Sequence, residues 1–535
     1  MKTNNYRNLF FTCFLLLVLM GCKNSNESKQ VVTDHEVKQA YTEEELYRPN
    51  FHFTPKTNWM NDPNGMFYYN GYYHLYFQYH PDSNVWGPMH WGHAISTDMI
   101  TWAEQPIAIF PDELGTIFSG SAVVDISNSS GLGETEKSIP IVAMYTNSKV
   151  REGQHDKQTQ SIAYSNDEGR TFTKYENNPV IDNDTIKDFR DPKVTWDEER
   201  NKWIMVLAAG DRINFYESKN LKEWKSISNF GKGVGGHGGV WECPDFFKLP
   251  VIGTDESKWV LFVSINPGGP NGGSATQYFV GDFDGTKFTM DKEFETSLTK
   301  EHNYWIDFGR DNYAGVTWSN ATKKDGSKLM IGWMSNWDYA QKVPTEKWRS
   351  AMTIARNIKL QKNESGYRLL FNPVSELESY RGSKFKDENI QIKEETNLIG
   401  STDIDLSSSE IKFSISDLKD GSFTYKLYNN EGDELLFGFD NTNNTYFINR
   451  KNSGKTDFEE KFANKVSVAK RTSTKSKLTG TVLLDKTSIE LFYDDGETVM
   501  TETFFPNAPF TQMSISPKKQ EFILETIEIN KLKFN

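Results

Sequence analysis

The sequence contains little cysteine, with three residues among 535, at Cys13, Cys22 and Cys243. The first two lie near the N-terminus, where processing is expected to remove Cys13 and to acylate Cys22. Cys243 is then left without a partner, and no disulfide bond is predicted. The sequence also lacks the paired His or Cys spacings that are typical of metal sites. We therefore predict no metal site and no cofactor.

The apolar run near the N-terminus is short. It spans residues 9–20, whereas a membrane-spanning helix needs about 20 apolar residues. A run of this length after basic residues is typical of a signal-peptide core. Leu19-Met20-Gly21-Cys22 is similar to a bacterial lipobox, which predicts a lipoprotein signal peptide over residues 1–21, lipidation of Cys22 and a polar tether over residues 22–48. A plain secretory signal is the alternative and would change only the anchor.

The chain is acidic, with a formal net charge of −13 at pH 7, and it has no long basic cluster. Such a charge distribution is unsuited to nucleic acid and to electrostatic adhesion to anionic lipid. We therefore predict no nucleic-acid partner, and membrane contact only through the N-terminal lipid anchor. The expected location is that of an exported bacterial lipoprotein on the periplasmic or cell-surface side of a membrane, with the oligomeric state left open.

Aromatic residues are abundant, at 14% of the chain with 14 Trp. This composition suits both β-structure and a sugar-binding surface, since both use flat faces. Up to about residue 370, strand and turn signals alternate with little helical periodicity. Residues 66–78, MFYYNGYYHLYFQ, predict a β-hairpin around Asn70-Gly71, the pair favoured in type I′ turns. We therefore predict an all-β chain.

Polar motifs recur at a regular interval in this β-rich part. Asp62, Ser119, Asp191, Glu242 and Asp307 are separated by 57, 72, 51 and 65 residues, about the length of one four-stranded propeller blade with its loops. In a second pattern of similar spacing, a small residue leads a polar turn that is closed by an aromatic residue, at Trp102, Phe172, Trp224 and Phe288. The five polar motifs predict a five-bladed β-propeller over residues 49–370, with its motifs gathered at the central axis.

The pattern of strand and turn signals changes after about residue 370. Residues 371–384 are predicted to form a short, partly helical connector. Beyond it, strands alternate with turn signals at the spacing of an antiparallel β-sandwich, which we place at residues 385–535. This region lacks an acid close to a proline, so we predict that it serves packing or carbohydrate contact rather than catalysis.

Three acids of the propeller share one design, a carboxylate placed just before proline or one residue from it. They occur in Asp62-Pro63, Asp191-Pro192 and Glu242-Cys243-Pro244. Proline fixes its own φ and restrains the preceding residue, so each acid is expected at a strand-to-turn junction. Three acids among aromatic residues, without metal-ligand spacing, indicate glycoside hydrolysis. A retaining glycosidase needs a nucleophilic carboxylate and an acid/base carboxylate about 5–5.5 Å apart.

The motifs Trp59-Met60-Asn61-Asp62-Pro63-Asn64-Gly65, Arg190-Asp191-Pro192 and Glu242-Cys243-Pro244 resemble the three signatures of glycoside hydrolase family 32, the β-fructosidases that include levanases, inulinases and invertases. The resemblance covers the chain from about Pro49 onward. It implies a five-bladed propeller followed by a β-sandwich. It also implies release of terminal non-reducing β-D-fructose from levan or inulin, and from sucrose, through a fructosyl-enzyme intermediate.

Residue by residue, the resemblance implies that Asp62 is the nucleophile, that Glu242 is the acid/base and that Asp191 stabilises the transition state with Arg190 beside it. The residues expected to match or lie close to the fructose subsite are Trp59, Met60, Asn61, Gln78, Trp86, Phe118, Ser119, Arg190, Asp307 and Trp337. A pocket for one terminal fructose favours cleavage from the chain end. The choice between β-2,6 and β-2,1 linkages stays open.

Two alternatives are considered. Residues 165–172, SNDEGRTF, resemble a sialidase Asp-box, but a sialidase would need three arginines around a carboxylate, and the repeated motifs contain acids instead. The second alternative is a lipid-anchored glycan-binding protein without catalytic activity.

Residues 231–236 satisfy the dinucleotide pattern GxGxxG, yet they lead into the segment of Glu242 rather than a helix, so we expect a loop there.

Overall fold

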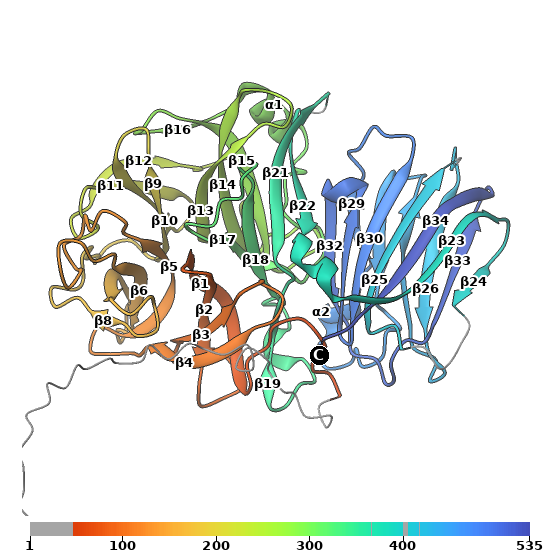
Figure 1. Ribbon diagram of the computed structural model, residues 1–535, viewed down its shortest axis with the longest axis horizontal. Coiled ribbons are helices and arrows are strands. Elements are labelled where there is room, and N and C mark those ends of the chain that lie inside the picture. The colour runs from red at the N-terminus through yellow and green to blue at the C-terminus, as the bar shows by residue number, and fades with distance from the viewer. Residues whose placement is uncertain (1–45, 365, 400–404, 417, 535) are drawn as a thin grey trace, which may run out of the picture.

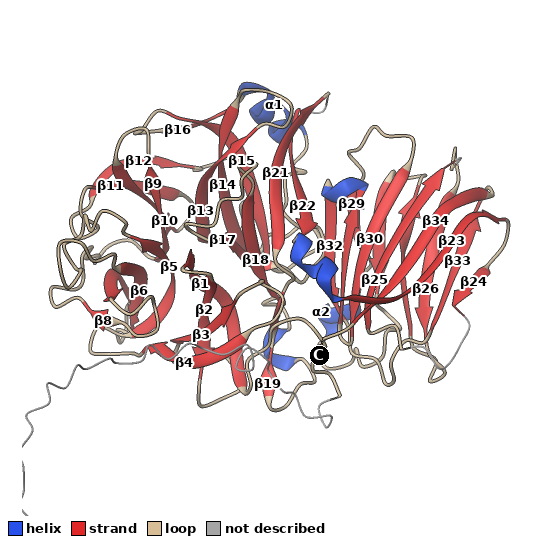
Figure 2. Ribbon diagram, in the orientation of Figure 1, coloured by secondary structure: helices blue, strands red, loops and turns tan. Residues whose placement is uncertain are grey.

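The computed structural model describes residues 46–364, 366–399, 405–416 and 418–534. These residues form two bodies that lie side by side, both built almost entirely of strands (Figures 1 and 2). The predicted signal peptide, Cys22 and most of the predicted tether lie outside the described residues. No helix of the described part is both long and apolar enough to cross a membrane.

Five sheets follow one another along the first body. The first contains β1 (Asn58–Tyr69), β2 (Tyr72–His80), β3 (His90–Ser96), β4 (Ala103–Ile109) and, parallel to β1, β19 (Trp348–Arg349). The second contains β5 (Thr116–Val124), β6 (Ile141–Lys149), β7 (Lys157–Ser165) and β8 (Thr173–Lys174). The third contains β9 (Phe189–Asp197), β10 (Lys202–Ala209), β11 (Ile213–Ser218) and β12 (Lys225–Phe230).

The remaining two sheets complete this body. The fourth contains β13 (Val240–Pro250), β14 (Ser257–Asn266), β15 (Ala275–Phe283) and β16 (Phe288–Met290), followed by helix α1 (Lys292–Lys300). The fifth contains β17 (Tyr313–Thr317), β18 (Lys328–Met334), β20 (Ala351–Met352), β21 (Arg356–Asn363) and β22 (Gly366–Pro373). The short helix η2 (Ala340–Lys342) lies between β18 and β19.

The first strands of the five sheets surround a common axis. β1 contacts β5, β5 contacts β9, β9 contacts β13, β13 contacts β17, and β17 returns to contact β1. This closed ring is the arrangement of a β-propeller, in which the first strands of the blades line the centre. Four of the five predicted motifs, those of Asp62, Ser119, Asp191 and Glu242, lie within first strands.

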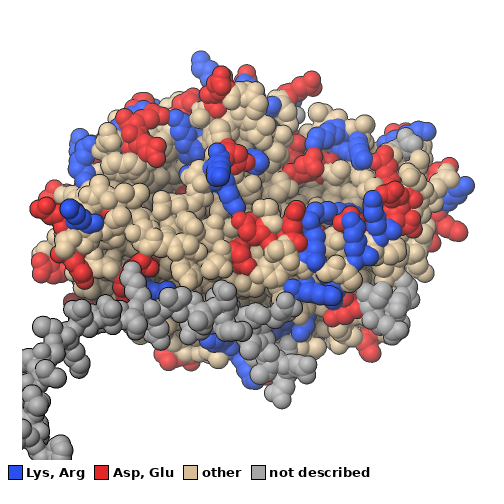
Figure 3. Space-filling model, in the orientation of Figure 1, with Lys and Arg blue, Asp and Glu red and all other residues tan. Residues whose placement is uncertain are grey.

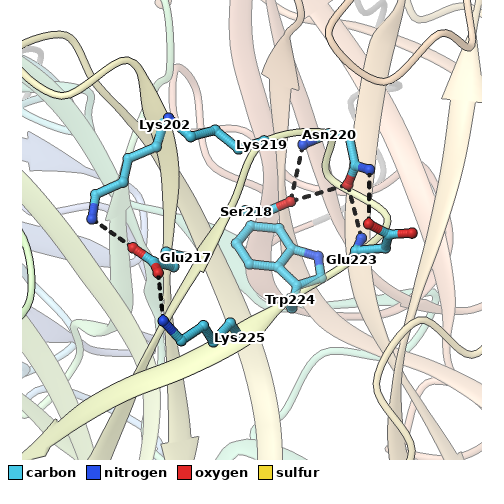
Figure 4. Close-up of a pocket in the computed structure, with 8 residues that line it drawn as sticks. All are labelled: Lys202, Glu217, Ser218, Lys219, Asn220, Glu223, Trp224 and Lys225. Atoms are coloured by element: carbon cyan, nitrogen blue, oxygen red, sulfur yellow. Dashed lines mark hydrogen bonds and ion pairs between the residues drawn. The ribbon is translucent and has the colours of Figure 1, made fainter.

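The predicted hairpin and the second repeated pattern are both confirmed as local structures. β1 and β2 are joined at Asn70 and Gly71, which have φ of 46° and 91°. The polar turn recurs after the third strand of a sheet, as Figure 4 shows for Ser218 and Trp224. The Ser218 hydroxyl accepts from the backbone N–H of Asn220 at 3.1 Å, and the Trp224 indole N–H donates to a backbone oxygen of the same turn.

The second body is a sandwich of two six-stranded sheets. One contains β23 (Arg381–Ile392), β25 (Ser408–Ser416), β30 (Leu478–Asp485), β31 (Ser488–Tyr493), β32 (Thr498–Thr503) and β34 (Phe522–Leu532). The other contains β24 (Thr396–Ile399), β26 (Ser422–Tyr428), β27 (Glu434–Asp440), β28 (Thr445–Asn449), β29 (Ser467–Lys470) and β33 (Gln512–Lys518). Helix α2 (Glu460–Ala463) and the short helix η4 (Asp494–Gly496) lie in its loops. An all-β chain with a propeller followed by a sandwich is therefore confirmed.

The junction between the bodies differs slightly from the predicted boundaries. β22 continues to Pro373, a short helix η3 (Ser375–Tyr380) follows, and β23 begins at Arg381. The connector is thus shorter than the predicted 371–384, because each flanking strand extends into that range. On the face shown in Figure 3, acidic and basic side chains are interspersed rather than segregated.

Candidate active site

Three acids far apart in the sequence meet around one cysteine and one arginine. The thiol of Cys243 lies 3.4 Å from Asp62 Oδ2 and 3.6 Å from Asp191 Oδ2. The backbone N–H of Cys243 donates to Asp191 Oδ2 at 3.0 Å. Glu242 directly precedes this cysteine and accepts from Arg190, the neighbour of Asp191. The structure therefore brings together all three carboxylates that the sequence singles out.

Irregular backbone turns these acids away from the regular alternation of their strands. The pairing register shifts around Asp62 in β1, opposite Asp191 in β9 and just after Glu242 in β13. Asp191 and Cys243 have positive φ, of 65° and 43°. An extra residue in a strand re-aims its side chains, and the adjacent prolines cannot donate to a neighbouring strand in any case. Bulges at the acid-proline motifs thus direct carboxylates toward the axis.

Glu242 is held from both sides. Its Oε1 accepts from Arg190 Nε at 3.2 Å and from Nη2 at 2.9 Å, while Oε2 accepts from the Tyr313 hydroxyl. Arg190 also donates from Nη1 to Asp188 at 2.7 Å. The sequence did not single out Tyr313 or Asp188. Tyr313 lies at the start of β17, the first strand of the fifth sheet. Its position follows the spacing of the other motifs, and this spacing was the available signal in the sequence.

Asp62 is buried, and one of its oxygens is free of protein partners. Ser119 donates to Oδ2 at 2.7 Å, whereas no hydrogen bond within the described residues reaches Oδ1. Burial raises the pKa of Asp62, the Ser119 hydrogen bond opposes this, and the nearby charge of Glu242 adds to it. The arrangement leaves one oxygen available for a ligand atom.

Asp191 is also buried, and its charge state depends on its neighbours. Burial raises the pKa of Asp191 to about 7, with the charges of Glu242 and Asp62 adding to the rise and Arg190 opposing it. Burial opposes the charge of Arg190, but the carboxylates of Glu242, Asp191 and Asp188 hold its pKa above its usual range. The acid cluster therefore retains a proton up to about neutral pH.

Aromatic rings form the wall beside the acids. Trp337 is half-buried and stacks on Trp59 with ring centroids 5.8 Å apart, and it also contacts Trp333 at 4.9 Å. Phe118 packs against the same cluster, and the exposed Trp86 meets Phe118 at 6.2 Å. Such a wall suits the apolar face of a sugar ring. Trp333 is not among the predicted site residues.

Two predicted residues support β1 through polar contacts. Asn61 Oδ1 accepts from the Trp59 indole N–H at 2.7 Å, and the Asn61 side chain also helps to lower the pKa of Asp62. Gln78 is buried in β2 and donates to Asn64 Oδ1 at 2.7 Å. Both contacts fix residues on either side of Asp62.

The expectation that Met60 contacts substrate is wrong. Met60 is fully buried and belongs to the main hydrophobic core with Phe53 and Phe77, separate from the cluster of Trp59 and Cys243. Successive side chains of a strand point to opposite faces. Because Trp59 and Asn61 lie on either side of Met60, its side chain takes the core-facing position.

The expectation for Asp307 is also wrong. Asp307 Oδ2 pairs with Arg356 at 2.9 Å and accepts from the hydroxyl of Thr501, a residue of the sandwich, at 2.6 Å. Its Oδ1 accepts from the backbone N–H of the same threonine at 2.8 Å. Its motif keeps the period of the others, but the side chain joins the propeller to the sandwich.

The axis is nearly closed behind the acids. A cavity of about 10 Å³, which is about one water in size, is lined by Asn64, Asp191 and Cys243 and ends at Lys193. The Lys193 ammonium pairs with Asp245 at 3.2 Å and donates to the Thr317 backbone oxygen at 2.5 Å. The packing therefore leaves room for only about one water between the acids and Lys193.

A shallow pocket on the third sheet has different chemistry. It measures about 350 Å³ and surrounds Trp224 on the outer strands β11 and β12 (Figure 4). Its acid Glu217 pairs with Lys202 at 2.6 Å and with Lys225 at 3.4 Å. Because that carboxylate is neutralised and the pocket is far from the first strands, we place the active site at the axis. Within the described residues, no group of three or more His, Cys, Asp or Glu is placed to hold a metal ion.

Comparisons with known proteins agree with this arrangement. Residues 52–373 match the model of the glycosyl hydrolases family 32 N-terminal domain, and residues 376–531 match that of the family 32 C-terminal domain. The chain is 48% identical over 466 residues to a levanase of Bacillus subtilis, which covers 87% of this chain and 67% of that protein. It is 38% identical over 500 residues to an extracellular exo-inulinase of Aspergillus niger, which covers 88% of this chain and 92% of that protein.

A solved structure gives the same result. The crystal structure of exo-inulinase from Aspergillus awamori superposes with a TM-score of 0.82 at 34% identity, covering 92% of this chain and 99% of that one. The match extends over the propeller and the sandwich together. The chain therefore belongs to glycosyl hydrolase family 32 and is a glycosidase.

Proposed function

We propose that the protein is a retaining glycosidase that releases terminal non-reducing β-D-fructose from levan or inulin, and from sucrose. The single observation that supports this proposal is the convergence of Asp62, Asp191 and Glu242 around Cys243 and Arg190, where the axis is nearly closed behind them. Relatives named levanase, exo-inulinase and invertase agree with this substrate class.

The first step forms a fructosyl-enzyme. Asp62, through the oxygen that has no protein partner, attacks the anomeric carbon C2 of the terminal fructose. Glu242 gives its proton to the glycosidic oxygen as the C2–O bond breaks, so the leaving sugar departs as a neutral alcohol. Ser119 holds the other oxygen of Asp62 and thereby fixes the direction of attack.

The second step releases fructose with the same configuration at C2. The ionised Glu242 takes a proton from water, and the water oxygen bonds to C2 while the ester bond to Asp62 breaks. This returns Glu242 to its protonated form and Asp62 to its ionised form. Asp191 accepts hydrogen bonds from sugar hydroxyls, and these bonds strengthen as positive charge develops on the ring. Arg190 stays fixed against Glu242 and Asp188 throughout.

The closure of the axis behind the acids favours cleavage at chain ends. Lys193 and Asp245 block the axis behind the acids, so a polymer cannot pass through. One terminal sugar can lie against the half-buried Trp337, which rests on Trp59, and the rest of the chain extends outward past the exposed Trp86. This geometry supports removal of one fructose at a time.

The location of the enzyme is part of the proposal. The lipobox-like sequence ending at Cys22 supports an exported lipoprotein, held on the periplasmic or cell-surface side of a membrane by its lipid. Substrate then reaches the enzyme outside the cytoplasm. Cys22→Ser is expected to abolish lipid labelling of the protein in producing cells.

Product analysis tests the reaction. The enzyme is incubated with levan, inulin and sucrose side by side, and early products are followed by chromatography and NMR. We expect free fructose as the first product, initially as the β-anomer, without intermediate oligosaccharides. Asp62→Asn and Glu242→Gln are each expected to lower kcat by at least about 100-fold in a protein that still folds. Binding of fructan without fructose release by the wild-type enzyme would contradict the proposal.

A further inference from the structure

Trp337 forms part of the sugar pocket, but it lies on a loop rather than on a strand. It follows β18 and belongs to the segment of residues 336–342, here called the Trp337 segment, which ends with η2. Its indole stacks on Trp59 and meets Trp333 in a tilted contact, so its position sets the width of the pocket on that side. A residue of this kind depends on whatever fixes its loop.

On the propeller side, the segment is held near its beginning. Asn336 donates to the Arg310 backbone oxygen at 2.7 Å, and the Trp337 N–H donates to the Ser274 hydroxyl at 3.2 Å. Neutral hydrogen bonds of this kind stabilise only modestly. They fix the entry into the segment, but they leave the residues after Trp337 to other contacts.

On the other side, the segment is held by the sandwich. Tyr339, two residues after Trp337, donates its hydroxyl to Asp311 at 2.8 Å and accepts from Arg450 Nη2 at 2.7 Å. Arg450 comes from the sandwich and also pairs with Asp311 at 2.6 Å. The Tyr339 ring meets the edge of Phe462, in α2, at 5.0 Å. The tyrosine is thus clamped between charged groups of both bodies.

The clamp is rigid because its charges are buried and paired. Arg450 is 2% exposed, pairs with Glu502 at 2.9 Å and lies 3.9 Å from the centre of the Phe462 ring. Two further ion pairs join the same parts at the surface, Asp338 with Lys461 at 2.9 Å and Lys342 with Glu459. Four contacts therefore connect the Trp337 segment to residues 450–463 of the sandwich, where α2 lies against the propeller (Figure 1).

We propose that the sandwich completes the sugar pocket from outside the propeller, with Tyr339 and Arg450 as positioning residues that fix Trp337. The inference rests on the proposed function, since it assigns Trp337 to the pocket for the terminal fructose. It gives the second body a role in substrate binding that acts through the propeller. Loss of the clamp weakens binding of the sugar and leaves the acids in place.

The test variant is Tyr339→Phe, which removes one hydroxyl and keeps the ring on Phe462. The matched control is Tyr446→Phe, because Tyr446 is equally buried in the sandwich and donates at 2.6 Å to Asp494, which pairs with Arg471. Both variants are expected to lower the melting temperature similarly. Only Tyr339→Phe is expected to raise KM for sucrose and Ki for fructose, by about 3- to 10-fold, the effect of one hydrogen bond. Its kcat is expected to change less than twofold.

A double-mutant cycle separates positioning from general stability. In a Trp337→Ala background, Tyr339→Phe is expected to have no further effect on KM. Arg450→Lys, which keeps the charge but loses the planar fork, is expected to raise KM as Tyr339→Phe does and serves if that variant does not fold. Equal KM values for Tyr339→Phe and Tyr446→Phe, or additive effects in the cycle, would overturn the inference. Absence of fructose release by the wild-type enzyme would instead overturn the proposed function.

Discussion

Arg190 donates two hydrogen bonds to a single oxygen of Glu242, from Nε at 3.2 Å and from Nη2 at 2.9 Å. The third nitrogen of the guanidinium binds Asp188 at 2.7 Å. The planar fork of arginine thus fixes the carboxylate that we propose gives and takes a proton. Because the fork is satisfied on both sides, Glu242 cannot rotate without breaking charged hydrogen bonds.

Arg190→Lys is expected to lower kcat/KM by about 10- to 100-fold, because an ammonium cannot reproduce the paired donors and a small displacement of the acid is costly. Initial rates on sucrose measure the effect. Arg200→Lys is the control, since Arg200 binds Asp197 in the loop at the other end of β9. The control is expected to keep wild-type activity. Equal losses in the two variants would show that the change acts through stability.

Asp191→Asn is expected to stabilise the protein at pH 8 while it lowers activity. Burial raises the pKa of Asp191 to about 7 from 3.8, so the folded state favours the protonated acid. Stability from this group is complete below about pH 4 and is lost as pH rises toward 7, at up to about 1.4 kcal/mol per pH unit. Asparagine has no such loss. Thermal melting between pH 4 and 8 measures the difference.

Two outcomes give that comparison its meaning. If the melting temperature of the wild type falls relative to that of Asp191→Asn as the pH rises from 4 to 8, ionisation of Asp191 destabilises the folded protein. The acid is then retained for function at a cost in stability. A constant difference between wild type and variant at all pH values would contradict the buried, raised pKa of Asp191.

Cys243 is expected to resist thiol reagents in the folded protein. Burial and the surrounding charges of Asp191 and Asp62 raise its pKa, so the reactive thiolate does not form near neutral pH. Reaction with DTNB at pH 8 measures this for a form that begins after Cys22. We expect no reaction in buffer and one reactive thiol in guanidinium chloride. Rapid reaction of the folded protein would show that the pocket opens to the thiol.

The period of the acid-proline motifs was sufficient to predict which residues meet. Asp62, Asp191 and Glu242 occupy first strands, and the proline beside each acid accompanies a bulge that turns the carboxylate toward the axis. Because proline and turn signals are local properties of the chain, this part of the site could be derived from the sequence. The assembly of the blades then follows from their repetition.

The direction of individual side chains could not be derived in the same way. Met60 lies within a recognised motif, yet the two-residue period of a strand places it in the core. Asp307 keeps the motif period, but its partners Arg356 and Thr501 lie in later parts of the chain that spacing alone does not bring near. Contacts between the two bodies depend on how they dock, and no local pattern in the sequence encodes that.

His52 connects the propeller to the sandwich at a second place. Its ring nitrogens lie 2.8 Å from Asp485 and 2.8 Å from Glu490, both carboxylates of the sandwich. Burial opposes the charge, but these hydrogen bonds raise the pKa of His52 to about 9. Stability from this group is therefore complete below pH 6.5 and is lost as pH rises through 9.

His52→Gln is expected to melt several degrees lower than the wild type at pH 6, because it removes a buried cation between two carboxylates. The difference is expected to shrink toward pH 9.5, since the wild-type imidazole loses its proton there. His155→Gln, a change at a partly exposed position of the propeller, is the control and is expected to follow the wild-type curve. A gap between His52→Gln and wild type that stays constant from pH 6 to 9.5 would show that packing, rather than the charge of His52, holds this part of the junction together.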